Sequence, residues 1–219
     1  MGRRGRAVDN GAMNEDGLEV TRRSLHAVAE LVLAGPQYRA TGRLRLRVVP
    51  GGFATTFAPD VRVQGASVEA GHTQSQISGQ TARTLGARLG IAAGRPEGAY
   101  RDGCGVGVDE PLALRADHAA AVLDALALGH GALSAFAPGE VPVLWPEHFD
   151  VAIRVDEVNY GVSPGDGLIA EPYAYVGVGQ VPAGDAFWNA PFGAARPLRD
   201  LDGLDGTVTF FAEGRERAR

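Results

Sequence analysis

Lysine is absent from the chain, and all 21 of its basic residues are arginine. Without lysine the protein cannot form a Schiff base with a carbonyl substrate or hold pyridoxal phosphate covalently. The lysines of the phosphate-binding loop and of the protein-kinase strand are missing as well. The absence of lysine therefore excludes several large enzyme classes. We also expect a protein that works without a bound cofactor.

Other absences bear on location and partners. Cys104 is the only cysteine, which excludes an internal disulfide and a cysteine-rich metal cluster. No run approaches the roughly 18 apolar residues that cross a bilayer, and no apolar segment follows the basic N-terminus as it does in a secretory signal. The formal charge of −5 disfavours nucleic acid as a partner. We therefore expect a cytoplasmic protein that binds neither membranes nor nucleic acid.

Two hydrophobic periods along the chain predict the fold class. The helical period predicts helices over 21–34, 117–136 and 207–217, and more weakly over 81–89. A period of two, with Pro-Gly and Gly turns, predicts β-hairpins over 43–57 and 61–69 and further strands within 141–178. Because the strands come as hairpins, we predict an α+β fold with a mainly antiparallel sheet and helices packed on one face.

Composition also predicts the domain organisation. Residues 1–16 are polar and lack periodicity, so we predict a disordered N-terminal extension there. No repeat or low-complexity linker divides the remainder, which predicts a single α+β domain over 17–219. Gly35-Pro36 is predicted to end the first helix.

Two motifs resemble catalytic or cofactor-binding fingerprints but lack what the chemistry needs. Gly161-Val162-Ser163-Pro164-Gly165 matches the G-x-S-x-G elbow of serine hydrolases, whose oxyanion hole uses the N–H of the residue after the serine. Pro164 has no N–H, and no helical pattern follows, so we interpret this segment as a turn. The glycine-rich stretch around Cys104 lacks the third glycine of a dinucleotide fingerprint, which favours a loop and a cysteine that is merely a small residue.

His148 and Asp150 are spaced as the first two ligands of a non-haem iron triad. That triad needs a second histidine, which usually lies downstream. The other four histidines all precede His148, and none has the spacing of a structural metal site. We therefore predict that the protein holds no stoichiometric transition metal.

The best candidate site is a polar strand face in the C-terminal half. Over 148–156 the side chains alternate, with Phe149, Val151, Ile153 and Val155 on the apolar side. The polar side combines an imidazole, carboxylates and a guanidinium, which suit acid–base catalysis or recognition of a small polar ligand. We assign catalytic roles to His148 and Asp150, and ligand-binding roles to Arg154, Glu171, Tyr173, Tyr175, Trp188 and Asn189.

This assignment assumes that 148–156 pairs directly with 171–177. An antiparallel register that sets Arg154 opposite Glu171 also sets Asp150 opposite Tyr175. The connection over 157–169 would then be a long, ordered loop. The alternative is a non-catalytic interaction module that uses an aromatic surface around Trp145, Trp188 and Phe192. The sequence leaves open whether the protein is an enzyme, and it does not predict an oligomeric state.

Several long strings carry a family resemblance. LWPEHFDVAI, VNYGVSPGD, EPYAYVG, FWNAPFGA and LRVVPGGFAT resemble an uncharacterised family of proteins from high-GC bacteria, over nearly the whole chain from about Glu19. The WPEHFD string is also similar to a Trp-His-Phe-Asp motif of another uncharacterised bacterial domain family. The resemblance implies no activity, fold or catalytic residue, although it implies that serine often stands at the position of Cys104.

Overall fold

A ten-stranded antiparallel sheet organises the part of the chain that the structure describes. The computed structural model describes residues 12–219, with side chains from residue 17 onward. The predicted α+β class, with a mainly antiparallel sheet and helices on one face, is confirmed. Residues 1–11 of the predicted N-terminal extension lie outside the described residues, whereas residues 12–16 belong to the first helix rather than to a disordered tail.

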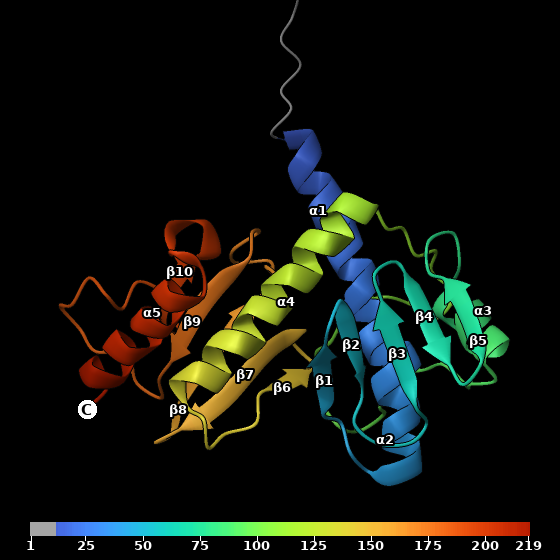
Figure 1. Ribbon diagram of the computed structural model, residues 1–219, viewed down its shortest axis with the longest axis horizontal. Coiled ribbons are helices and arrows are strands. Elements are labelled where there is room, and N and C mark those ends of the chain that lie inside the picture. Colours follow the sequence, from blue (N-terminus) through green and yellow to red (C-terminus); the bar gives the residue numbers. More distant parts are fainter. Residues whose placement is uncertain (1–11) are drawn as a thin grey trace, which may run out of the picture.

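The strand order is β10-β9-β8-β7-β6-β1-β2-β3-β4-β5, so the pairing of β1 with β6 joins an N-terminal and a C-terminal half (Figure 1). The two hairpins predicted in the N-terminal half are present as β1–β2 and β3–β4. The strands are β1 Leu46–Val49, β2 Gly52–Thr55, β3 Val61–Gln64, β4 Ser67–Ala70, β5 Thr73–Gln76, β6 Val143–Trp145, β7 Asp150–Val155, β8 Val158–Ser163, β9 Tyr173–Gly177 and β10 Gly193–Pro197.

Three of the predicted helices are confirmed, although the last one begins earlier than predicted, at Gly203. In Figure 1 α4 lies diagonally across β7 and β8, and α5 lies beside β9. The helices are α1 Ala12–Ala27, the π-helix η1 Val28–Ala34, α2 Gly35–Thr41, α3 Ala82–Leu89, α4 Ala116–Phe136, the 3-10 helix η2 Leu198–Asp200 and α5 Gly203–Arg217.

The predicted end of the first helix at Gly35-Pro36 is wrong, because the chain stays helical through η1 and α2 to Thr41. In the π-helix the amide of Gly35 bonds to the carbonyl of Glu30, five residues back. By the same spacing Leu31 would bond to Pro36, which has no N–H. The amide of Gly94 takes that place, at 2.8 Å from the Leu31 oxygen. A neighbouring segment thus satisfies the carbonyl that the proline leaves free.

The predicted direct pairing of 148–156 with 171–177 is wrong, because β8 lies between them. β7 turns back through Asp156 and Glu157, which both have positive φ, at 50° and 66°. This backbone is that of a two-residue hairpin turn, but the pair lacks the Asn-Gly or Asp-Gly sequence typical of it. The sequence therefore predicts a loop where the structure has a strand.

The register that follows differs from the predicted one. Arg154 lies opposite Asn159 rather than Glu171. Asp150 and Tyr175 are on strands two apart. The β7 residue in line with Tyr175, through Gly161 of β8, is Ala152, and Asp150 is two residues away on the same face. The predicted loop over 157–169 is replaced by β8 and by a connection over 164–172 between β8 and β9.

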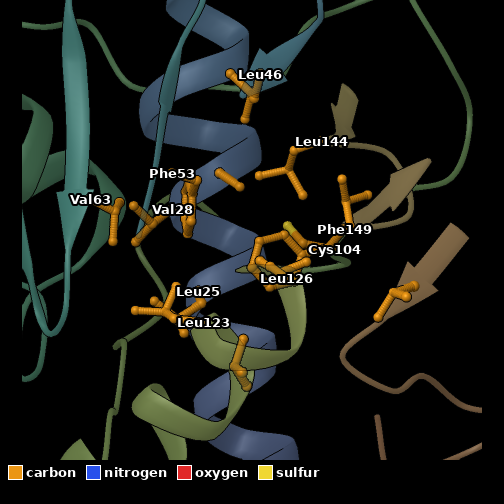
Figure 2. Packing of buried hydrophobic residues seen from close by; sticks show 14 of the residues in the cluster. Leu25, Val28, Leu46, Phe53, Val63, Cys104, Leu123, Leu126, Leu144 and Phe149 are labelled. Carbon is orange, nitrogen blue, oxygen red and sulfur yellow. The ribbon is translucent and has the colours of Figure 1, made fainter. Parts of the chain in front are cut away.

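The hydrophobic core lies between the helices and one face of the sheet. Figure 2 shows Leu46, Phe53 and Leu144 from the strands together with Leu25 and Val28 from the first helical segment. Glycines permit the closest approaches of helix to sheet: a Cβ on Gly129 of α4 would lie 2.6 Å from Val162, and one on Gly214 of α5 would lie 2.6 Å from Val176. The alternate side chains of β7–β9 therefore point away from both helices.

Within the described residues, α4 is the one helix long and apolar enough to cross a membrane by length and composition. It packs on β7, β8 and α1. A buried core helix of a soluble protein has the same composition, so the structure is compatible with a soluble protein.

Candidate functional site

A pocket opens on the polar face of the sheet, which we define as the side of β7–β9 opposite α4 and α5. Its volume is about 350 Å³, within the range of small-molecule sites. Three neighbouring strands and the loops at their ends supply its walls. The lining residues are Asp150 from β7, Asn159 and Ser163 from β8, Tyr173, Tyr175 and Gly177 from β9, and His148, Asp166 and Phe192 from adjoining segments.

Asp150 is the most buried acidic group of this pocket, with 6% of its surface exposed. Its Oδ2 accepts a hydrogen bond from the hydroxyl of Tyr175. Its Oδ1 is buried and has no hydrogen-bond partner among the described residues. A buried polar atom without a partner costs about 1–3 kcal/mol. Because Asp150 lines the pocket, this oxygen is an acceptor that the protein itself does not use.

Gly161 lets Tyr175 reach Asp150. The glycine lies between them on β8, directly opposite Tyr175. A Cβ at this position would lie 2.5 Å from both Cζ and Oη of the tyrosine. The ring therefore crosses β8 over a residue without a side chain. The tyrosine hydroxyl on β9 can then reach the carboxylate on β7.

Burial sets the protonation of this pair. Desolvation raises the pKa of Asp150 above its ordinary value, although the bond from Tyr175 and the nearby His148 oppose the shift. Burial, followed by the charge of Asp150, raises the pKa of Tyr175 well above its ordinary value. Tyr175 accordingly keeps its proton and acts as the donor.

A second tyrosine–carboxylate pair closes one end of the pocket. The hydroxyl of Tyr173 donates to Oδ2 of Asp166 at 2.5 Å. Oδ1 of Asp166 accepts from the amides of Leu168 and Ile169 at 2.7 and 2.9 Å. Burial, and then the bond to Asp166, raises the pKa of Tyr173. Both oxygens of this carboxylate are thus engaged in holding the segment between β8 and β9.

Ser163 belongs to the same wall, contacts the hydroxyl of Tyr173 and bonds within its own turn. Its Oγ accepts from the amide of Gly165 at 3.1 Å and donates to the carbonyl of the same residue at 3.2 Å. The residue ends β8, and no helix follows it. This turn lacks the strand–serine–helix geometry of a nucleophile elbow.

The segment between β6 and β7 carries His148 into the pocket on a strained backbone. Phe149, the next residue, has φ of 55°, which is unusual for an aromatic residue and costs on the order of 1–3 kcal/mol. Its ring is held in the core by a stacked contact with His26 and an edge contact with Phe53, with centroids 5.3 and 5.6 Å apart. His26 Nε2 also donates to the carbonyl of Pro146 at 2.8 Å. One histidine of α1 therefore holds this segment at two points.

A second pocket of about 330 Å³ adjoins the first, and His148 and Asp166 line both. Its carboxylates outnumber its guanidinium groups, since Glu19, Asp102, Glu147 and Asp166 face only Arg22 and Arg23. Burial lowers the pKa of His26, which lines this pocket together with His148, so the imidazole of His26 is neutral near pH 7.

Some predicted site residues lie outside the pocket. Arg154 is on β7 but exposed, and Glu171 pairs with Arg199. Asn189 bonds to the backbone of Ala195 at 2.9 and 3.1 Å. Trp188 is buried, 8% exposed, and packs edge-on against Phe187.

The aromatic residues of the alternative hypothesis, an interaction module, do not form one surface. Trp188 is buried in the core. Trp145 is on β6, whereas Phe192 precedes β10, and three strands separate β6 from β10. Phe192 instead borders the pocket, with its ring edge-on to Tyr175 at 6.0 Å.

Sequence reasoning missed Asn159, Ser163, Asp166 and Gly161 as parts of the site. The signal was present, because Val158, Tyr160 and Val162 alternate with polar or small residues as in a half-buried strand. Two glycines and a proline nearby resemble turn residues and conceal that alternation.

Among the described residues, no three His, Cys, Asp or Glu side chains are grouped as metal ligands. Comparison with known proteins identifies no relative, since no protein-family model, curated protein or solved structure matches this chain. Any functional inference therefore depends on the geometry of the pocket.

Proposed function

We propose that the protein binds a small polar molecule in the pocket between Asp150, Tyr173 and Tyr175. The observation that carries this proposal is the buried Oδ1 of Asp150, which has no partner among the described residues. Surface polar groups bond to water, and core polar groups bond to protein. A buried acceptor beside a pocket of this size is instead matched by a ligand donor.

The residues around Asp150 suit recognition of a ligand better than an exposed strand surface would. Tyr173 is 4% exposed, and its ring lies 6.3 Å from that of Tyr175. Phe192 borders the same space. Apolar walls with a few placed polar groups are typical of small-molecule sites, and rigid strands hold these groups more accurately than loops do.

Binding is the function that these groups support most directly. A carboxyl group of raised pKa is also a candidate acid or base, and His148 lines the same pocket with a largely exposed side chain. No second observation identifies a reacting atom, so we restrict the proposal to ligand binding.

A fragment screen by amide NMR tests this function. We expect one-ring fragments to shift the amides of Ser163, Tyr175 and Gly177, and Asp150→Asn or Tyr175→Phe to weaken that response. Asp156→Asn is the matched control, because it makes the same change at an exposed turn of the same hairpin. If no fragment of any charge shifts these amides, the proposed function is wrong.

A further inference from the structure

The donors and acceptors of the pocket are unequally available. The hydroxyl proton of Tyr175 is used by Asp150, and that of Tyr173 by Asp166. The hydroxyl proton of Ser163 is used by the carbonyl of Gly165. Every hydroxyl donor that lines the pocket is therefore committed to the protein, while Oδ1 of Asp150 is an uncommitted acceptor. The side-chain donors that remain in the lining, the amide of Asn159 and the imidazole of His148, are on exposed residues. The buried part of the pocket therefore offers an acceptor rather than a donor.

The charges of the lining have the same bias. Asp150 and Asp166 line the pocket, no arginine does, and His148 is the one residue there that can become positive. Its side chain is 66% exposed, so water screens any charge that it carries. An anionic ligand would meet two carboxylates without a buried cation to balance its charge.

The adjoining pocket extends this acidic surface. Of its two arginines, Arg23 is paired with Glu110 at 2.5 Å, and Arg22 donates to the carbonyl of Ala170 at 2.8 Å. Among the described residues Glu147 has one ion pair, with His148 at 3.9 Å, and it forms only when that histidine is protonated. The bond to a carbonyl leaves the charge of Arg22 in place, but the carboxylates of this lining still outnumber its guanidinium groups. The approach to the Asp150 pocket therefore favours positive ligands.

Aromatic rings supply the third element. Tyr175 lies between Tyr173 and Phe192, with ring centroids 6.3 and 6.0 Å apart. The faces of such rings attract cations. An unpaired buried carboxylate oxygen beside several aromatic rings is complementary to a cationic donor group on a compact apolar body.

We propose that the ligand of this pocket is an organic cation whose ammonium or amidinium group donates a hydrogen bond to Oδ1 of Asp150. This inference rests on the proposed function and names the ligand class. The cation replaces the missing partner of Oδ1, and its apolar body lies against Tyr175 and Phe192. A neutral amide of the same shape lacks the charge, and a carboxylate lacks the donor and is repelled.

Three compounds of nearly equal shape separate these possibilities: benzamidine, benzamide and benzoate. We expect benzamidine to bind at least about tenfold more tightly than either of the others near pH 8, because a hydrogen bond between two charged groups is stronger than one with a neutral partner. Titration calorimetry, or amide shifts where binding is weak, gives the three affinities. Binding of benzamide or benzoate as tightly as benzamidine would overturn the inference.

Variants assign the effect to Asp150. Asp150→Asn preserves the shape and removes the charge, so benzamidine should lose at least about tenfold in affinity. Tyr175→Phe is a second variant that leaves the carboxylate in place and should retain the preference for the cation. Asp156→Asn should bind like the wild-type protein. Unchanged affinity in a folded Asp150→Asn protein would contradict the inference.

The result also separates this inference from the function on which it rests. If other fragments shift the pocket amides but benzamidine does not, the ligand class is wrong and the binding function stands. If no fragment binds, both are wrong.

Discussion

Tyr175 donates its hydroxyl proton to Asp150 across an entire intervening strand, because the residue beneath its ring is Gly161. The three residues form one unit in which an aromatic side chain packs on the backbone of the neighbouring strand. The unit places the acceptor of the pocket, and its parts can be tested separately.

Substitution Gly161→Ala should disrupt this unit. The new Cβ would lie 2.5 Å from the end of the Tyr175 ring, so the ring must swing away and release Asp150. Losing that bond costs about 1.5–3 kcal/mol, and replacing glycine by alanine within a strand returns about 0.5–1 kcal/mol. We expect a net loss of about 1 kcal/mol in urea unfolding together with loss of the pocket response. Gly139→Ala, where a Cβ meets nothing within 4 Å, should change stability by less than about 0.5 kcal/mol.

The buried carboxyl group should make stability depend on pH. Burial raises the folded-state pKa of Asp150 above its unfolded value, so the folded protein binds the proton more tightly than the unfolded chain does. Its contribution to stability is therefore complete below the unfolded pKa, near 3.9, and declines as pH rises through the raised value.

Asp150→Asn removes this dependence, because an amide does not titrate. We expect the free energy of unfolding of the variant, relative to wild type, to increase between about pH 4 and pH 8. Urea unfolding at several pH values measures it. A difference that stays constant over this range would mean that Asp150 titrates like an exposed aspartate.

The sequence pattern predicts several residues that line this pocket, but not how the strands bring them together. Period-two alternation identified the polar side of β7 and the tyrosines of β9, since that pattern depends only on the strand backbone. The predicted register is wrong because it relies on matching Arg154 with Glu171, a charge pair at the edge of the buried surface. Such pairs contribute only about 0.2–1 kcal/mol and do not fix a register. Burial of Val151 against Val162 fixes it instead.

Tertiary contacts explain the other failures. Trp188 and Asn189 lie in a segment that composition marks as a polar or aromatic loop, but the tryptophan packs with Phe187 in the core. Gly35-Pro36 is a helix stop in most contexts, and it fails here because a residue far along the chain, Gly94, bonds to the freed carbonyl. Neither contact has a local sequence signal.

Cys104 should react slowly with alkylating reagents. Burial, and next its contact with Glu30, raises the pKa of its thiol to about 12. Near pH 8 only about one molecule in ten thousand then carries the thiolate, which is the reactive form. We expect iodoacetamide to label the folded protein at least about 100-fold more slowly than the protein unfolded in guanidinium. Equal rates would show an accessible, activated thiol and would restore Cys104 as a candidate nucleophile.

The last prediction concerns Glu30, a fully buried carboxylate of the π-helix. Its Oε1 pairs with Nε of Arg95 at 2.9 Å, and its Oε2 accepts from the amide of Cys104 at 2.7 Å. The two bonds tie the segment that follows α3 to the first helix. They also satisfy a charge that would be costly to leave alone in the core.

Arg95→Ala should therefore destabilise the protein more than the same change at an exposed ion pair. It leaves a buried charge whose remaining partners among the described residues are the amide and the thiol of Cys104. We expect a loss of at least about 2 kcal/mol, below the full 3–5 kcal/mol because Arg95 is itself half exposed. Arg83 is the matched control, since it pairs with Asp109 at 2.6 Å and both side chains are more than 60% exposed. Arg83→Ala should cost clearly less than Arg95→Ala, because water screens an exposed ion pair. Equal losses in urea unfolding would mean that burial of the carboxylate does not decide the strength of these pairs.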